Sequence, residues 1–363
     1  MARILYFSRD YTPHDYRFLT ALAKTEHRVC FLRLENEATV IEDRPLPPEI
    51  EQVEWAGGKG AARLKDGPRL LADLRRVIQH LKPDLIHAGP IQRAAFLVAL
   101  TGYTPLVSMS WGYDLLCDAR INPFWAWATR YTLHHSASMV GDCATIRNLA
   151  IAYGMPADRI VTFPWGVDIS HFEVTTFERP NVQTFNLLST RGFEPIYGSE
   201  LIARAFVLAA RQKPDLRLTM IGDGSLKATI RQIFLVGAVY DRVHFAGLVP
   251  YEELPGYYRS ADVYLSASHS DGSSISLLEA FACGTPAIVS DIPGNREWVV
   301  PGENGWLFSD GDAQALAEAI LKAYEQRHKL PQMGRNARQL AEQRADWEKN
   351  YPLLEKAYTM ALS

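Results

Sequence analysis

Short runs of consecutive apolar residues alternate along this chain with longer segments in which apolar residues recur every three or four positions. The short runs predict buried strands, and the longer segments predict amphipathic helices. In the first half the predicted strands are residues 4–7, 29–34, 85–88, 106–109, 139–141 and 160–163. The predicted helices between them are residues 16–24, 68–81, 92–100, 124–134 and 144–153. This order predicts a doubly wound parallel sheet, in which ligands bind at the carboxyl ends of the strands.

The alternation stops near Pro164-Trp165-Gly166-Val167-Asp168, and a polar segment without strands continues to Gln183. It then resumes with predicted strands 185–189, 216–221, 243–246 and 263–267 and predicted helices 199–212 and 225–234. We therefore predict an α/β protein with two doubly wound, Rossmann-like domains facing a cleft. The expected boundaries are residues 1–166 and 167–345. The segment 346–363, with one amphipathic helix over residues 347–361, is expected to pack back onto the first domain.

One stretch, residues 268–286, combines several signals of ligand binding. It follows a predicted strand, and small residues Gly272, Ser273 and Ser274 precede a helical pattern that starts at Ile275. A helix start presents unpaired backbone N–H groups and the positive end of the helix dipole, which favours phosphate. Carboxylates bracket this turn at Asp271 and Glu279. A phosphate site between two carboxylates that can accept hydroxyl groups fits a sugar nucleotide.

The bulk composition is that of an ordinary globular protein and excludes several classes. Of 363 residues, 47% are hydrophobic and 22% are charged, and the net charge of −3 gives no electrostatic case for nucleic acid. Four widely spaced cysteines predict reduced thiols rather than a disulfide or metal framework. Neither a signal peptide nor an apolar run long enough to span a bilayer is evident, so a cytoplasmic location is expected. Contact with the inner face of a membrane stays open, as does the oligomeric state.

Two motifs in the second half each carry a functional and a structural interpretation. The turn Gly222-Asp223-Gly224 between a strand and a helix fits close approach of a ligand, and it equally fits a plain tight turn. Arg191 follows the strand at 185–189, where a guanidinium can bind pyrophosphate with two hydrogen bonds. The alternative for Arg191 is a solvated side chain paired with Glu194.

Candidate acceptor residues lie in two loops of the first domain. His14 and Asp15 belong to the polar loop after the first strand, and Trp111, Tyr113 and Asp114 follow the strand at 106–109. Asp114 is a candidate base or hydroxyl ligand, or else the N-cap of a helix ahead of Leu115. Basic residues also cluster between residues 59 and 82, where a solvated helix face competes with a surface for anionic lipid: Lys59, Arg63, Lys65, Arg69, Arg75, Arg76 and Lys82.

No metal site is expected. Asp310-Gly311-Asp312 has the spacing of cation ligands, but Asp312 directly precedes a helical pattern and is better explained as its N-cap. No GxGxxG motif follows a strand, which disfavours a nicotinamide dehydrogenase.

Taken in order, these segments resemble the retaining glycosyltransferases of glycosyltransferase family 4, which have the GT-B fold. Residues 164–172, Pro-Trp-Gly-Val-Asp-(three residues)-Phe, look like the family's hinge motif. Residues 271–286 match its signature of two acidic residues separated by seven others, which ends in Leu-Leu-Glu-Ala-Phe-Ala-Cys-Gly-Thr-Pro. Arg191, the Gly222–Gly224 turn and residues 243–247 match further positions of the pattern. The helix with Trp347 and Tyr351 is similar to the family's cross-over helix.

The resemblance implies metal-independent transfer of a sugar, with retention, from a nucleoside diphosphate sugar (UDP-, GDP- or ADP-linked) to a hydroxyl acceptor. By this resemblance Glu279 would bind the ribose and Asp271 would orient the sugar, while Asp114 belongs to the segment that often carries a catalytic histidine. The residues implied to bind the donor are Arg191, Gly222, Gly224, Gly247, Leu248, Asp271, Gly272, Ser273, Ser274, Ile275 and Glu279.

Four positions depart from the family pattern. Asp271 replaces the usual Glu, Pro195-Ile196-Tyr197 stands where a lysine is expected, Trp111 replaces the histidine, and the first loop lacks Gly-Gly. Two rivals stay open. An epimerase or hydrolase of sugar nucleotides would have the same fold, and the missing lysine, histidine and Gly-Gly would fit a non-catalytic partner subunit that binds sugar nucleotides.

Overall fold

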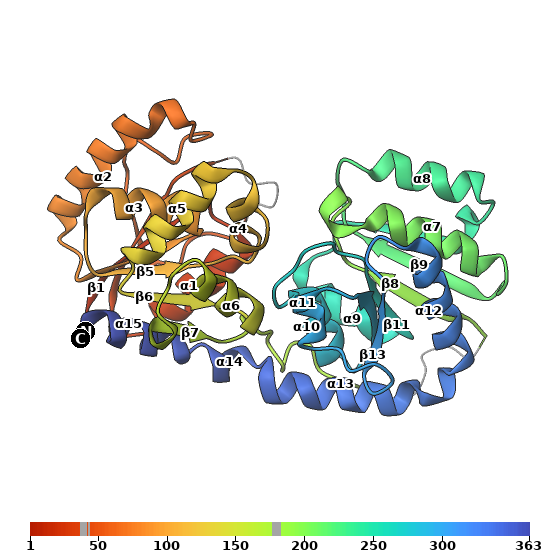
Figure 1. Cartoon of the computed structure of the whole chain (residues 1–363). Helices are drawn as coiled ribbons and strands as arrows, with labels where there is room; N and C mark the ends of the chain where they lie inside the picture. Colours follow the sequence, from red (N-terminus) through yellow and green to blue (C-terminus); the bar gives the residue numbers. More distant parts are fainter. Residues whose placement is uncertain (37–41, 43, 176–182) are drawn as a thin grey trace. The chain divides into compact units, whose positions relative to one another are not determined.

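The computed structural model describes residues 1–36, 42, 44–175 and 183–363. Within these residues the chain forms two compact units. One consists of Met1–Phe163 together with Tyr351–Ser363, and the other is Pro164–Asn350. Part of the segment predicted as the linker, residues 176–182, lies outside the described residues. Each unit is built on a parallel sheet flanked by helices (Figure 1), and this confirms the predicted fold class.

The first unit contains a parallel sheet with the strand order β3-β2-β1-β4-β5-β6-β7. The strands are β1 (Arg3–Ser8), β2 (Arg28–Arg33), β3 (Glu51–Gln52), β4 (Leu85–Gly89), β5 (Leu106–Met109), β6 (Ser138–Gly141) and β7 (Ile160–Thr162). The inner strands are buried on both faces, which explains why they read as uninterrupted apolar runs. The order reverses between β1 and β4, so the carboxyl ends of these two strands mark the expected ligand edge.

Helices cover both faces of this sheet. They are α1 (Pro13–Ala23), α2 (Gly67–Leu81), α3 (Phe96–Thr101), α4 (Tyr113–Leu116), α5 (Pro123–His134), α6 (Ala144–Ala152) and α15 (Leu353–Leu362). Helices α2 and α3 pack against Leu5, Ile86 and Ala88 on one face. On the other face, Phe18 of α1 and Tyr358 of α15 contact His87. Figure 1 shows α2, α3 and α5 together on the first of these faces.

The second unit contains a parallel sheet with the order β10-β9-β8-β11-β12-β13. The strands are β8 (Phe185–Ser189), β9 (Leu216–Ile221), β10 (Val243–Gly247), β11 (Val263–Ser266), β12 (Ala287–Ser290) and β13 (Gly305–Phe308). The helices are α7 (Ser199–Ala210), α8 (Lys227–Val236), α9 (Leu254–Ser260), α10 (Ile275–Ala282), α11 (Pro293–Arg296), α12 (Ala313–Glu325), α13 (Leu330–Arg344) and α14 (Trp347–Asn350). Here the order reverses between β8 and β11, so the loops after these two strands border the ligand edge.

The final helix differs from the prediction. A single helix over residues 347–361 was expected, but the structure has α14 and α15, separated at Tyr351 and Pro352. Proline has no N–H to donate and disfavours the helical conformation of the residue before it, so the helix is interrupted there. Helix α15 packs on the first sheet, where the Ser138 hydroxyl donates to the carbonyl of Ala357 at 2.9 Å and His87 Nδ1 lies 2.8 Å from the Tyr358 hydroxyl.

Candidate functional site

The two loops at the ligand edge of the second sheet are locked together by backbone contacts. Gly198, in the loop after β8, has φ +62°, and a Cβ there would lie 2.1 Å from the carbonyl oxygen of Ala267 at the end of β11. The N–H of His269 donates to the carbonyl of Ile196 at 2.9 Å. Only glycine permits this close approach of the two backbones. Gly198 therefore allows the loop that carries Arg191 to pack directly against the loop that carries Asp271.

The loop before α10 is supported from behind by α11. A Cβ on Gly294 would lie 2.4 Å from the carbonyl oxygens of both Asp271 and Gly272. The indole N–H of Trp298 donates to the Ser273 hydroxyl at 3.2 Å. Ser274 is the N-cap residue of α10, and its side chain makes no capping bond. The N-terminal amides of α10 are therefore not satisfied by the capping side chain, as a phosphate-binding helix start requires.

Arg191 is the centre of this edge. Its guanidinium lies 2.9 Å from the Asp271 carboxylate and donates to the hydroxyls of Ser274 at 3.3 Å and Ser276 at 3.2 Å. The guanidinium carbon also lies 4.3 Å from the centre of the Tyr197 ring. Burial is the largest single effect and opposes the charged guanidinium, but the Asp271 carboxylate and three neighbouring tyrosines together outweigh it, so the pKa of Arg191 is raised. Arg191 is thus a permanent cation whose side chain is 14% exposed and contacts the loop before α10.

The structure does not support the simpler interpretation of Arg191 as a solvated partner of Glu194. Glu194 instead accepts hydrogen bonds from the N–H of Ser225 at 2.9 Å and from the Ser225 hydroxyl. The nearest carboxylate that pairs with Arg191 is Asp271, eighty residues further along the chain. Long-range pairing of two predicted site residues is the pattern expected of a ligand-binding cluster.

Glu279 lies one layer deeper, within α10. Its side chain is buried, and Oε2 accepts a hydrogen bond of 2.7 Å from the hydroxyl of Tyr258. The Tyr258 hydroxyl also lies 2.9 Å from the hydroxyl of Thr190, which precedes Arg191. Burial and the Glu279 carboxylate together raise the pKa of Tyr258. Tyr258 therefore remains protonated and holds the carboxylate in a defined orientation.

The Gly222–Gly224 turn is explained by packing inside the unit. Gly222 has φ +130° and Gly224 has φ +152°. A Cβ on Gly224 would lie 2.7 Å from the carbonyl of Phe193, and one on Gly222 would lie 3.0 Å from the carbonyl of Arg191. These glycines let the turn support the loop of Arg191, and a direct contact with the donor stays a prediction. At Gly247 the space for a Cβ is open, and Leu248 is 82% exposed.

The candidate acceptor residues of the first unit fall into two groups. His14 and Trp111 lie together, with ring centres 5.4 Å apart, and the Tyr113 side chain is 52% exposed. Asp15 is buried instead: it forms a capping box with Thr12 at the start of α1 and accepts a hydrogen bond from the Tyr6 hydroxyl at 3.2 Å. Burial raises the pKa of Asp15 to about 6. Its position favours a structural role, and acceptor binding by these residues stays a prediction.

Asp114 is a buried hydrogen-bond acceptor within α4. It accepts hydrogen bonds from the Ser110 hydroxyl at 2.6 Å and from the N–H of Ile91 at 3.0 Å. The N-cap position of α4 is occupied by Gly112, so the alternative of Asp114 as N-cap is wrong. Burial raises the pKa of Asp114 to about 6. Asp114 therefore links the loop after β5 to the loop after β4 through hydrogen bonds.

Asp312 caps α12, accepting from the N–H groups of Gln314 and Ala315, as predicted. Asp310 instead lies 2.7 Å from His269 Nδ1. In the described part of the chain, no group of three or more His, Cys, Asp or Glu side chains is arranged to hold a metal ion. Over the same residues, no helix is long and apolar enough to cross a bilayer.

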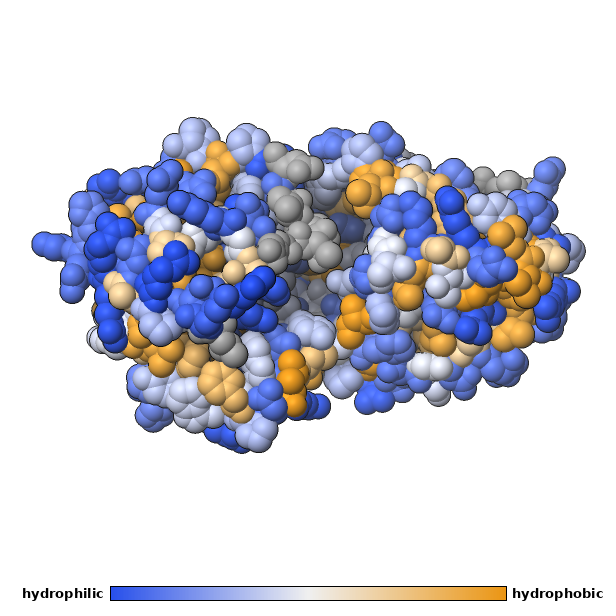
Figure 2. Space-filling view, turned by 90° about the horizontal axis from the view of Figure 1, so that it is seen from above, coloured by the Kyte–Doolittle hydropathy of each residue, from blue (hydrophilic) through white to orange (hydrophobic). Residues whose placement is uncertain are grey.

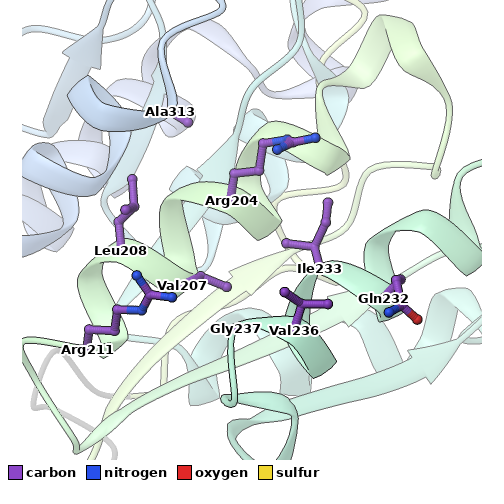
Figure 3. Close-up of a pocket in the computed structure, with 9 residues that line it drawn as sticks. All are labelled: Arg204, Val207, Leu208, Arg211, Gln232, Ile233, Val236, Gly237 and Ala313. Atoms are coloured by element: carbon purple, nitrogen blue, oxygen red, sulfur yellow. The ribbon is translucent and has the colours of Figure 1, made fainter.

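A groove of about 480 Å³ lies away from the ligand edge, between the C-terminal halves of α7 and α8. Figure 3 shows Val207, Leu208, Ile233 and Val236 around it, with Arg204 and Arg211 nearby. It contains none of the predicted site residues. The ligand edge thus brings together Arg191, Asp271, Ser274 and, through Tyr258 and Thr190, Glu279.

Sequence reasoning missed three residues of this edge: Tyr258, Tyr264 and Ser276. The Tyr264 hydroxyl donates to Ser276 at 2.7 Å, and Ser276 in turn contacts Arg191. Tyr264 lies within the apolar run 263–267, where an aromatic ring is expected in the core, and Tyr258 lies in a mixed segment, residues 252–260, that has no apolar run. The only signal that could have identified them is that a fully buried tyrosine needs a partner for its hydroxyl.

Two doubly wound parallel sheets, each with its own reversal point, define the GT-B class of proteins. The family model "Glycosyl transferase 4-like domain" matches residues 14–166, and "Glycosyl transferases group 1" matches residues 177–340. The chain belongs to the group 1 glycosyltransferases of glycosyltransferase family 4.

Relatives with names agree with this family. The amylovoran biosynthesis glycosyltransferase AmsK of Erwinia amylovora is 30% identical over 178 residues, which are 47% of this chain and 44% of that protein. The D-inositol 3-phosphate glycosyltransferase of Pseudarthrobacter chlorophenolicus is 28% identical over 220 residues, 58% of this chain and 52% of that protein. The chain therefore matches about half the length of these relatives.

Solved structures show the same fold over the whole chain. Sucrose-phosphate synthase from Thermosynechococcus elongatus has a TM-score of 0.82 at 19% identity, over 99% of this chain and 98% of that one. HepE from Anabaena, solved in complex with UDP, has a TM-score of 0.79 at 18% identity, over 98% of this chain and 99% of that one. At these identities the likeness establishes the fold alone.

Proposed function

We propose that the protein transfers a sugar from a nucleoside diphosphate sugar to a hydroxyl group of an acceptor, with retention of configuration. The observation that carries this proposal is the cluster of Arg191, Asp271 and the loop before α10 at the ligand edge of the second sheet. A guanidinium beside a helix start provides the positive charge that a diphosphate needs as its bond to the sugar breaks. Relatives named as glycosyltransferases, and HepE with bound UDP, support the same assignment.

In this proposal the second unit binds the donor and the first binds the acceptor. Arg191 and the amides of residues 272–275 hold the diphosphate, Glu279 accepts the ribose hydroxyls, and Asp271 orients the sugar. Gly222, Gly224, Gly247 and Leu248 complete the donor site in the positions that the resemblance implies. Since Tyr258 occupies one oxygen of Glu279, the carboxylate is fixed before the ribose arrives.

The chemical step breaks the bond between the anomeric carbon and the phosphate oxygen. The acceptor oxygen forms the new bond on the same face of the sugar, and the acceptor proton passes to the departing phosphate. Arg191 neutralises the charge that develops on this leaving group, and we propose that no metal ion is required. Addition of EDTA should leave activity unchanged, and the anomeric configuration of the product, read by NMR, should equal that of the donor.

The first test is thermal-shift measurement with UDP-, GDP- and ADP-sugars, because a ligand that binds only the folded protein raises the melting temperature. Arg191→Ala should weaken binding on the order of 100-fold, since a charge-assisted contact with two hydrogen bonds is lost. Arg204→Ala is the matched control: Arg204 is an exposed arginine of the same unit, paired with Glu200. Wild-type binding in both Arg191→Ala and Glu279→Ala would contradict the proposed site.

Two rivals make different predictions about turnover. An epimerase or hydrolase consumes the donor in the absence of any acceptor, whereas a transferase consumes it mainly when an acceptor is present. A non-catalytic subunit would bind a sugar nucleotide tightly in calorimetry. It would show no turnover with any acceptor of a broad panel. Replacement of the expected lysine by Pro195-Ile196-Tyr197 is the feature that keeps this second rival under test.

A further inference from the structure

The outer face of α5 carries a continuous stripe of aromatic rings. Phe124, Trp127, Tyr131 and His135 follow one another at helical spacing, with ring centres 5.7, 5.4 and 4.1 Å apart. Phe96 of α3 joins the stripe, 5.6 Å from Trp127. Rings three and four residues apart share one side of a helix, so α5 presents a single aromatic surface.

Much of this stripe, and the segment that leads into it, is exposed. Phe124 is 45% exposed and Trp127 is 47% exposed, while Ile121, just before the helix, is 60% exposed. The helix start is capped, because the Asn122 side chain accepts from the N–H of Trp125 at 3.1 Å and Pro123 occupies the first turn. Clustered exposed rings on a fixed helix indicate an interaction surface rather than isolated surface residues.

The layer that carries α5 is strongly basic, although the whole chain has a net charge of −3. Helices α2, α3 and α5 lie on the same face of the first sheet (Figure 1), and α3 contacts both of the others. Residues 67–82, 91–101 and 123–134 contain one acidic side chain, Asp73, and six basic ones: Arg69, Arg75, Arg76, Lys82, Arg93 and Arg130. Two of the six are paired, Arg76 with Asp73 and Arg93 with Glu35, so the positive charge of this layer rests on Arg69, Arg75, Lys82 and Arg130. Figure 2 looks down on this face, where hydrophilic side chains surround patches of hydrophobic ones.

We propose that this face of the first unit binds the surface of a bilayer that contains anionic lipids. Tryptophan and tyrosine favour the boundary between headgroups and acyl chains, because their rings are apolar and their polar atoms remain hydrated. Arginines beside them attract anionic headgroups, each strengthening binding by about fivefold near such a surface. The combination fits a lipid surface better than a protein partner, whose contact would need complementary carboxylates opposite widely spread arginines.

Co-sedimentation of the full chain with vesicles tests the proposal. Vesicles of phosphatidylcholine with phosphatidylglycerol should bind the protein at least tenfold more strongly than vesicles of phosphatidylcholine alone, and 1 M salt should reduce binding strongly. The double variant Phe124→Ser/Trp127→Ser should lower binding by about tenfold or more. Arg69→Glu/Arg130→Glu should lower binding to anionic vesicles and leave binding to neutral ones unchanged.

Val236→Ser is the matched control, because Val236 is 75% exposed on α8 of the other unit. It should bind vesicles as the wild type does. Because every substituted side chain is exposed or half-buried, unchanged melting temperatures verify that the variants fold. The proposal is overturned if the wild type binds neither kind of vesicle, if the aromatic double variant binds as the wild type does, or if Val236→Ser alone abolishes binding. None of these outcomes depends on turnover, so they are independent of the proposed transfer reaction.

Discussion

Replacing Tyr258 by phenylalanine removes one buried hydroxyl that holds the carboxylate of Glu279. The Tyr258 ring is fully buried, and its hydroxyl donates to Glu279 at 2.7 Å and lies 2.9 Å from Thr190. A hydrogen bond to a charged acceptor contributes about 1.5–3 kcal/mol, and phenylalanine fills the same space without a cavity. We therefore expect the free energy of unfolding of Pro164–Asn350 to fall by about 2 kcal/mol, which lowers its melting temperature by about 4–8 °C.

A double-mutant cycle with Glu279→Gln, followed by urea denaturation, assigns this loss to the pair. The coupling energy between Tyr258→Phe and Glu279→Gln should be about 1 kcal/mol or more. Tyr324→Phe is the matched control, because the Tyr324 hydroxyl donates to Asp215 at 2.7 Å in the same unit, in a pair separate from Glu279. The losses in unfolding free energy caused by Tyr324→Phe and by Glu279→Gln should be additive within about 0.5 kcal/mol. Simple additivity in the Tyr258 cycle would refute the view that this hydroxyl orients the carboxylate.

Two further predictions concern the loop before α10 and the first unit. Gly294→Ala forces a Cβ against the carbonyls of Asp271 and Gly272, so it should abolish nucleotide binding in calorimetry, whereas Gly256→Ala, where that space is open, should bind normally. Burial raises the pKa of Asp114 from 3.8 to about 6. Well below the ordinary pKa of 3.8 the side chain is protonated in both the folded and the unfolded state. Stability therefore falls as the pH rises from about 4 to 6, by about 3 kcal/mol in total. Urea denaturation between about pH 4 and 6 should show a smaller fall in unfolding free energy for Asp114→Asn than for the wild type. If the variant and the wild type show the same pH profile, the burial of the Asp114 charge does not cause the fall.

Strands and major helices were predictable because burial on both faces leaves a direct trace in the sequence. The bounds of β5, β8 and β9 agree with the predicted ranges. Helix α13 was missed because its buried positions are filled largely by small residues, Gly334, Ala337 and Ala341, which give a weak apolar pattern. Strand β3 has only two residues, both exposed, and carries no apolar run at all.

The candidate site was predictable as a set of residues but not as a network. Motif spacing placed Arg191 and Asp271 at strand ends, and the parallel order of strands then brings them near each other. Their direct contact depends on how the loops after β8 and β11 approach each other, and the bond from Tyr258 to Glu279 depends on how α9 packs against α10. No local sequence pattern encodes either arrangement. The prediction of Asp15 as an acceptor residue did not anticipate its burial for a related reason: a polar loop sequence does not reveal which of its carboxylates caps the next helix.

The attachment of α15 to the first sheet has a consequence for synthesis of the chain. Residues 351–363 cover β6 and contribute the partner of His87, yet they follow the entire second unit in the sequence. A ribosome therefore completes Pro164–Asn350 before the segment that covers His87 emerges, so the second unit can fold while the first is still unfinished. During that interval the part of the first sheet that α15 covers stays exposed, and exposed apolar surface of this kind is prone to aggregation.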